Sequence, residues 1–291
     1  MLAIRVPTLS AAVVPVLVGS ALAARSYPFD LLVFVIVLGA AILIQIGTNL
    51  TNDLFDFRKG ADTGARLGPV RVVQAGLLSQ KQVAAAIALT FGLAIVLGLY
   101  LIDVGGWPIL AIGIPSVAAG YFYTASPVSL AYVALGELTV FIFMGPAIVM
   151  GAYFVMALHF SAAALWASIA LGFLVAGILH SNNIRDIESD GRHGKRTLAT
   201  MLGRAGANYE LMALDVAAYA TTVVGVLAHA LPWIALIVFI TVPRALDQVR
   251  IVTRENDPKK LNVGLFRSIQ LHMEFGLLMI AAFLVAAFFG W

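Results

Sequence analysis

The 291-residue chain has no cysteine and few charged residues. The missing cysteine excludes disulfides, thiolate nucleophiles and cysteine-bound metals, so any metal site must use oxygen ligands or histidine. Charged residues make up 11% of the chain and hydrophobic residues 61%, whereas a soluble domain is roughly 25% charged and 45–50% apolar. This balance excludes an ordinary soluble enzyme, a disordered protein and a nucleic-acid-binding protein.

The hydrophobic residues form long runs, close to the length of about 20 residues that a bilayer-spanning helix needs. Glycine and proline recur inside these runs, as membrane helices tolerate. We predict one domain, residues 1–291, with the fold of an all-α polytopic membrane protein. Its nine transmembrane helices are expected at residues 7–24, 29–53, 82–103, 107–125, 130–153, 161–184, 207–229, 231–251 and 268–290. The first run also has the features of a signal peptide, which leaves that alternative open.

Basic residues predict which way the helices run. Sixteen of the 18 lysines and arginines lie in the connections after the second, sixth and eighth predicted helices. With nine helices, these three connections fall on one face of the membrane. The positive-inside rule makes that face cytoplasmic, with the N-terminus inside and the C-terminus outside.

Acidic residues gather in two similar motifs that end predicted helices. The first reads Asn52-x3-Asp56-x5-Asp62, and the second reads Asn182-x3-Asp186-x3-Asp190. Residues four apart share a helix face, so the second motif is expected to present its three side chains on one face. The spacing of 130 residues between Asp56 and Asp186 suggests an internal duplication, about 1–125 and 130–251, with the last helix left over.

Carboxylates on facing helices can bind Mg²⁺, which prefers oxygen ligands and leaves positions for phosphate oxygens. Basic residues follow each motif, among them Lys59, Arg71 and Lys195. Acids, Mg²⁺ and cations together indicate a diphosphate site. Two simpler explanations stay open. The acids could be solvated helix caps, and the cations could serve only membrane orientation and lipid headgroups.

These motifs, together with four other segments, resemble the UbiA superfamily of intramembrane prenyltransferases, and most closely its menaquinone branch. The second acidic motif and the Gly194-Lys195-Arg196-Thr197-Leu198-Ala199 stretch after it carry the most specific part of the resemblance. The other segments are Arg5-Val-Pro-Thr-Leu9, Tyr123-Thr-Ala-Ser-Pro127, Tyr132-Val-Ala-Leu-Gly136-Glu137 and Phe143-Met-Gly145-Pro146.

The resemblance implies nine helices around a central cavity and a Mg²⁺-dependent transfer of a polyprenyl chain from its diphosphate to 1,4-dihydroxy-2-naphthoate, with loss of CO₂. It also implies membrane lipids as partners, no nucleic acid, and an active site at the cytoplasmic face. Four acids are expected to hold Mg²⁺ and catalyse: Asp56, Asp62, Asp186 and Asp190. Substrate-binding roles are expected for Asn52, Asn182, Asn183, Lys59, Arg71 and Lys195, and an aromatic cage for Tyr121, Phe122, Tyr123 and Tyr132.

One segment departs from the family pattern. Relatives often carry a basic residue near Ala131–Val133, where this chain has none. The acceptor could therefore be hydroxybenzoate, homogentisate or a glycerol phosphate ether. A transporter is the alternative of another class, although transporters usually hold their sites near the membrane midplane. Glu137 could accept a proton or be a buried hydrogen-bonded group, and we favour the second. The sequence indicates neither the prenyl length nor the oligomeric state.

Overall fold

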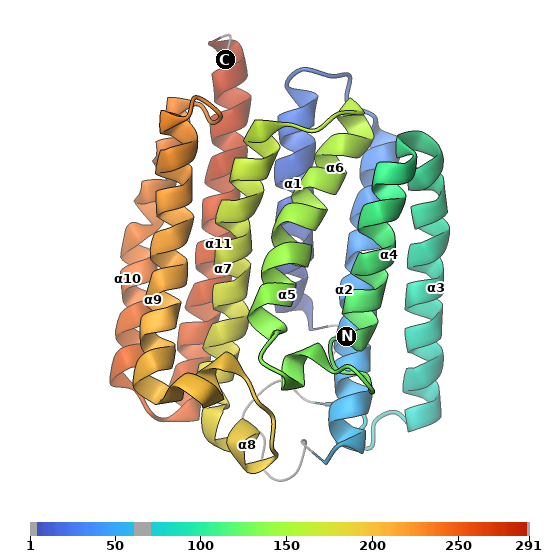
Figure 1. The fold of residues 1–291 in the computed structure, drawn as a ribbon, viewed down its shortest axis with the longest axis vertical. Coiled ribbons are helices and arrows are strands. Elements are labelled where there is room, and N and C mark those ends of the chain that lie inside the picture. The colour runs from blue at the N-terminus through green and yellow to red at the C-terminus, as the bar shows by residue number, and fades with distance from the viewer. Residues whose placement is uncertain (1–4, 61–70, 290–291) are drawn as a thin grey trace.

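The structure is a computed structural model that describes residues 5–60 and 71–289. In these two ranges all the regular secondary structure is helical, apart from one isolated β-bridge between Val133 and Arg196. Figure 1 shows long helices that run up and down side by side. The elements are η2 (Val6–Leu9), α1 (Ser10–Ala24), α2 (Leu31–Arg58), α3 (Gln80–Gly105), α4 (Trp107–Phe122), η3 (Leu130–Tyr132), α5 (Gly136–Ile142), the π-helical η4 (Phe143–Ala147), α6 (Ile148–Ala157), α7 (Ala162–Arg185), α8 (Ile187–Arg192), α9 (Leu198–Leu227), η5 (Trp233–Thr241), α10 (Val242–Arg254) and α11 (Pro258–Phe288).

Seven helical segments in the described ranges are long and apolar enough to cross a membrane. They are 6–24, 31–58, 80–105, 136–157, 162–185, 198–227 and 258–288. The predicted all-α fold is therefore confirmed. Helix α4 is apolar but has only 16 residues. The count of nine spans, the orientation of the termini and the internal duplication stay predictions.

Four predicted helices differ clearly from the structure in kind or extent. The last of them, expected from residue 268, begins at Pro258 as α11. The run 231–251 is not one α-helix, because residues Trp233–Thr241 form a 3₁₀ helix and α10 follows with Arg244, Asp247 and Arg250. The helix expected from residue 130 begins only at Gly136, because the residues before it form η3 and the bridge to Arg196.

Capping side chains fix several helix starts. Ser79 and Gln82 form a reciprocal capping box at the start of α3, and Thr197 and Thr200 do the same for α9. These pairs satisfy backbone N–H groups that a helix start leaves without partners. Thr197 caps α9 at residue 198, nine residues before the predicted start, and Gly203 then interrupts the helix with a φ of +66°.

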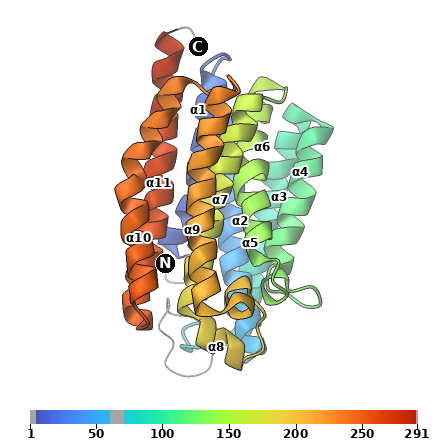
Figure 2. The same cartoon turned by 60° about the vertical axis from the view of Figure 1, so that its left-hand side comes forward.

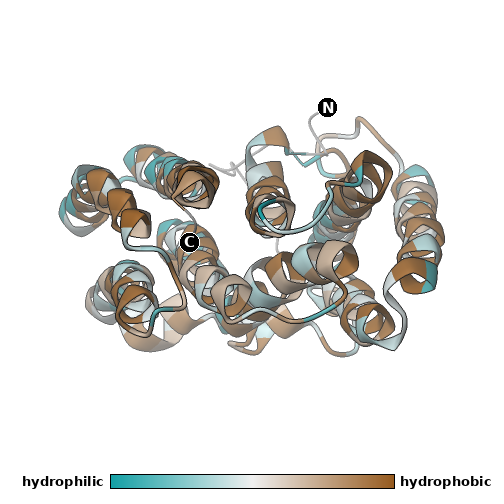
Figure 3. Cartoon of the chain, turned by 90° about the horizontal axis from the view of Figure 1, so that it is seen from above, coloured by the Kyte–Doolittle hydropathy of each residue, from teal (hydrophilic) through white to brown (hydrophobic). Residues whose placement is uncertain are grey.

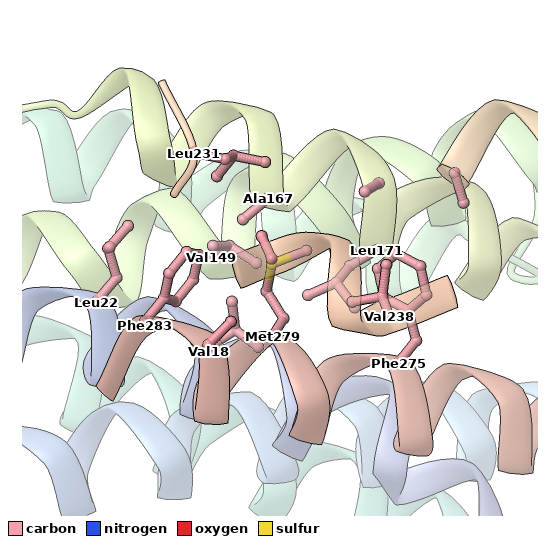
Figure 4. Close-up of a cluster of buried hydrophobic side chains, with 14 of the residues drawn as sticks. Val18, Leu22, Val149, Ala167, Leu171, Leu231, Val238, Phe275, Met279 and Phe283 are labelled. Carbon is pink, nitrogen blue, oxygen red and sulfur yellow. The ribbon is translucent and has the colours of Figure 1, made fainter. Parts of the chain in front are cut away.

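The largest hydrophobic cluster joins α1, α6, α7, η5 and α11 (Figure 4). Phe275, Phe283 and Leu171 are fully buried in it. Small residues let the helices approach each other: a Cβ at Gly145 would lie 2.6 Å from the Gly172 Cα. Close packing at small residues is the usual way that membrane helices associate.

The ends of α2 and α7, helix α8 and the segment before α5 lie at one end of the molecule (Figures 1 and 2). Viewed along the helices, hydrophobic residues dominate the ribbons (Figure 3). Because α2 and α7 run toward the same end, their two terminal acidic motifs come together there.

Candidate active site

A cavity of about 890 Å³ opens between α1, α2, α3, α4, α5, α6 and α7. Polar residues line it at the end where the acidic motifs lie: Arg5, Asn49, Asn52, Asp56, Arg71, Asn182, Asn183 and Lys195. Away from that end the lining is apolar and includes Val37, Leu101, Ile109 and Val155. The cavity is thus a slot with one polar end, suited to an amphiphilic molecule with an anionic head.

The first motif presents Asn52 and Asp56 on the cavity face of α2, as their spacing predicts. Asp56 is buried and accepts hydrogen bonds from Arg71 Nη2 at 2.6 Å and from the Tyr132 hydroxyl at 2.8 Å. Asn52 accepts one from Thr124 Oγ1 at 2.8 Å. Asp62, the last residue of the motif, lies outside the described residues.

Asp53 was given no role by the sequence interpretation, yet it fixes the position of Arg71. Its carboxylate is buried and accepts hydrogen bonds from the backbone N–H groups of Val72 and Val73, at 2.9 and 3.2 Å. This fastens the chain next to Arg71 onto α2. The partners lie 19 and 20 residues away, so no local pattern signals the contact.

The second motif is not presented on one continuous helix face, contrary to prediction. Helix α7 ends at Arg185, and Asp186 takes a non-helical conformation before α8, which carries Asp190. At this break Arg185 donates from Nε and Nη2 to the two Asp186 oxygens at 2.8 and 2.5 Å. The same guanidinium reaches Asn182 Oδ1 at 2.7 Å. Arg185 is therefore a site residue that the sequence interpretation missed.

Lys195 folds back onto the second motif. Its ammonium lies 3.2 Å from Asp190 Oδ2, and its backbone N–H donates to the Asp190 carbonyl. Gly194 makes this turn with a φ of +68°, which costs a glycine little. Burial raises the pKa of the Asp190 carboxyl, Lys195 opposes that rise, and Asp186 adds to it.

The segment that lacks a basic residue lies beside the second motif. Val133 and Arg196 form a parallel bridge, with the Ala134 N–H donating to the Arg196 carbonyl at 2.8 Å. Lys195 Nζ lies 5.7 Å from the centre of the Tyr132 ring. The loop after α8 therefore brings Lys195 and Arg196 beside a segment that has no basic residue of its own.

Lys59 and Tyr132 do not line the cavity and lie just behind its polar end. Lys59 donates to the Thr124 carbonyl and to Ser129, and its ammonium lies 4.0 Å from the centre of the Tyr132 ring. Burial raises the pKa of the Tyr132 hydroxyl, as does the neighbouring Asp56 carboxylate, so the hydroxyl keeps its proton and donates to Asp56. These two residues join the α4–α5 connection to α2.

Tyr121, Phe122 and Tyr123 do line the cavity, as expected. The Tyr121 ring meets Phe55, Phe91 and Phe122 edge to face. Tyr123 is buried. The predicted aromatic cage is thus reduced to residues 121–123, while Tyr132 contacts the motif acid instead.

Glu137 belongs to a buried polar network, the alternative favoured from the sequence. Its Oε1 accepts hydrogen bonds from His180 Nδ1 at 3.0 Å and from the Asn183 amide at 2.9 Å. His180 Nε2 lies 2.9 Å from the Ala207 carbonyl, so the network links α5, α7 and α9. Asn183 also lines the cavity, and Glu137 fixes the direction in which its amide points.

The donor set at the polar end fits Mg²⁺. Among the described residues, no three acidic or histidine side chains converge on one metal position. Mg²⁺ does not require such a cage, because it is usually bound by one or two carboxylates together with phosphate oxygens and water. Of the three acids that supply hard oxygen ligands, Asp56 lines the cavity, whereas Asp186 and Asp190 are not among its lining residues. Each of the three contacts a cation, Arg71, Arg185 or Lys195.

Comparison with known proteins decides the family. The profile of the UbiA prenyltransferase family matches residues 12–271. The chain belongs to this family. It is 35% identical over 283 residues to the 1,4-dihydroxy-2-naphthoate octaprenyltransferase of Bacillus subtilis (strain 168), covering 97% of this chain and 90% of the relative. The resemblance inferred from the motifs is confirmed, and the chain is a prenyltransferase rather than a transporter.

Solved structures of the family share the fold. A UbiA homologue from Aeropyrum pernix K1 in its apo form aligns with a TM-score of 0.73 at 20% identity, covering 97% of this chain and 98% of that one. A homologue from Archaeoglobus fulgidus bound to DMAPP and Mg²⁺ aligns with a TM-score of 0.68 at 17% identity, covering 96% and 98%. Together with the apolar helices, this makes the chain an integral membrane protein.

Proposed function

We propose that this prenyltransferase transfers a polyprenyl chain from its diphosphate to 1,4-dihydroxy-2-naphthoate, with loss of the ring carboxylate as CO₂. The observation that carries the proposal is the slot with an acidic, cation-rich end and an apolar remainder. The name of the 35% identical relative supports the naphthoate acceptor. The bound DMAPP and Mg²⁺ of the Archaeoglobus fulgidus homologue support the donor class and the metal.

The diphosphate binds at the polar end, where three cations contact three acids. Arg71, Arg185 and Lys195 each pair with a motif carboxylate in the structure. Phosphate oxygens compete for these cations, and an arginine can hold phosphate through two parallel hydrogen bonds. Asn52 and Asn182 stand on the same cavity wall and orient the head group. Lys59 supports this clamp from behind by holding the loop that carries Tyr132.

The acids Asp56, Asp62, Asp186 and Asp190 are the residues that hold Mg²⁺. When bound, the metal neutralises charge on the diphosphate and stabilises it as a leaving group. When the cationic side chains turn from the acids to the phosphates, carboxylate oxygens become available to the metal.

The reaction breaks the bond between the prenyl C1 and the diphosphate oxygen, and the electron pair leaves with the diphosphate. Tyr121, Phe122 and Tyr123 present aromatic rings to the cavity, where they stabilise positive charge and exclude water. An electron pair of the acceptor ring forms the new bond to C1. The pair from the breaking ring–carboxylate bond then restores the aromatic ring, and CO₂ leaves.

The acceptor carboxylate is assigned to Arg196 in the loop after α8, while Lys195 stays with the diphosphate. The backbone of Arg196 pairs with Val133, in a segment that has no basic residue of its own. This supports an acidic ring as acceptor. The site lies at the end of the molecule that holds α8 and the basic connections (Figure 1), and by the positive-inside rule we assign that end to the cytoplasm.

The test uses the full chain in nanodiscs with 1,4-dihydroxy-2-naphthoate, a polyprenyl diphosphate and Mg²⁺, and measures prenylated product and CO₂. We expect product that disappears with EDTA, returns with added Mg²⁺, and is lost in Asp186→Asn. Asp103→Asn is the matched control, because Asp103 is exposed near the end of α3. Product that resists EDTA would contradict the metal site. Product with hydroxybenzoate but not with the naphthoate would replace the proposed acceptor.

A further inference from the structure

The apolar part of the cavity extends far beyond the diphosphate site. Its lining on α2 runs from Asp56 to Val37, always on one side of the helix. At 1.5 Å per residue this face is about 28 Å long, close to the roughly 30 Å of a bilayer's hydrocarbon core. An occupant can therefore lie along nearly the whole membrane thickness.

Five glycines line the cavity, and three of them come from three different helices and have open space beside them: Gly98 of α3, Gly113 of α4 and Gly151 of α6. We call them the glycine collar. A Cβ added to Gly98 or Gly113 would meet nothing within 4 Å. At Gly151 it would meet only the Ile112 side chain, at an ordinary 3.8 Å. Packing does not require glycine at these positions, and the space beside them is open.

The collar residues lie at one depth, which contacts between helices establish. A Cβ on Gly39 of α2 would lie 3.2 Å from Leu97 Cδ1, next to Gly98 in the chain. A Cβ on Gly151 would lie next to Ile112, the neighbour of Gly113.

Helix α4 can be placed along α2 in the same way. A Cβ on Gly120 would lie 2.7 Å from Thr48 Oγ1, and both helices run toward the active-site end (Figure 1). Gly113 lies seven residues before Gly120 on α4, and Ala41 lies seven residues before Thr48 on α2. Gly113 and Ala41 therefore lie at the same depth. The collar therefore lies level with α2 residues 39–41, about 24 Å from Asp56 at 1.5 Å per residue.

We propose that the glycine collar determines which donors the enzyme accepts, by leaving the distal end of the slot open to long polyprenyl tails. The inference rests on the proposed function and deepens it, because it assigns donor length to three named positions. A short tail ends before the collar and does not contact it. A long tail must pass it, so a side chain at the collar obstructs long donors selectively.

The test compares Gly98→Leu and Gly113→Leu with Gly92→Leu. Gly92 is the matched control: it lies on α3, a Cβ there also meets nothing within 4 Å, and it does not line the cavity. For each variant, kcat/KM is measured with octaprenyl diphosphate and with geranyl diphosphate, and thermal unfolding is followed in the same detergent. Because the two collar variants are on different helices, either one can carry the test if the other does not fold.

We expect kcat/KM for the octaprenyl donor to fall about tenfold or more in the collar variants, the effect of overpacking a filled site. The geranyl donor should change less than about twofold, and Gly92→Leu should affect neither donor. An equal fall in kcat/KM for both donors, or no fall for the long donor, would overturn the proposed role of the glycine collar. Failure of the unmodified enzyme with both donors would instead contradict the proposed function.

Discussion

Arg71 donates to Asp56 at 2.6 Å, and both side chains are buried at the polar end of the cavity. This contact joins the segment that begins at residue 71 to the first acidic motif. It keeps a cation that we assign to phosphate on the carboxylate that we assign to Mg²⁺. The consequence is that substituting either residue removes this buried ion pair.

Asp56→Asn should lower kcat/KM by more than about 100-fold, because it removes a negative ligand that is worth several kcal/mol of transition-state charge stabilisation. Steady-state kinetics at saturating Mg²⁺ measures this effect. Asp247→Asn is the control, since Asp247 pairs with Arg267 on α11, away from the cavity. Full activity of Asp56→Asn would remove Asp56 from the metal site.

Asp53→Ala should lower the free energy of unfolding by about 1–3 kcal/mol, since two buried backbone N–H groups lose their acceptor. It should also raise the KM for the donor, because Arg71 is no longer fastened to α2. Asp53→Asn retains one carbonyl oxygen as acceptor and should recover part of both losses. Unfolding in detergent and donor titration measure them. An unchanged unfolding midpoint would show that the contact between Asp53 and the Val72 and Val73 N–H groups does not stabilise the protein.

Glu137→Leu should destabilise the protein by about 3–5 kcal/mol, because His180 and Asn183 both lose their buried acceptor. Glu137→Gln keeps a carbonyl oxygen at this position and should be milder. Thermal unfolding is the measurement, with turnover per folded molecule beside it. A Glu137→Gln variant that folds normally but does not turn over would make Glu137 a chemical participant.

Gly194→Ala should raise the KM for the donor and lower the free energy of unfolding by about 1–2 kcal/mol. An alanine at a φ of +68° costs roughly 1–2 kcal/mol, and the strain would act on the turn that returns Lys195 to Asp190. Gly191→Ala is the matched control, since its Cβ meets nothing within 4 Å and its φ is not positive. Equal kinetics of the two variants would show that the turn does not position Lys195.

The sequence predicted what local spacing encodes. Asn52 and Asp56 share a face because they lie four apart on an uninterrupted helix, and both reach the cavity. It could not predict Asp53, whose partners are some 20 residues away. It also placed Asn182, Asp186 and Asp190 on one helix face, because their spacing does not show that Asp186 separates α7 from α8.

The membrane helices, too, were predictable only as far as local composition encodes them. Uniformly apolar runs were found where helices occur, but the 3₁₀ conformation of Trp233–Thr241 has no signal in composition. The basic residue beside Val133 is Arg196, from the loop after α8. The sequence does not show this contact, because it depends on the bridge that the fold forms between the two residues.

The cavity has a polar end and an apolar slot, and this polarity has a consequence for the direction of the reaction. A water-soluble ring acid and a tail dissolved in lipid can meet there while each stays in its own phase. After transfer, the diphosphate returns to water and the ring, now attached to a long hydrocarbon, returns to the bilayer. The two products no longer share a solvent in which they could recombine, so the enzyme's shape separates them as it forms them.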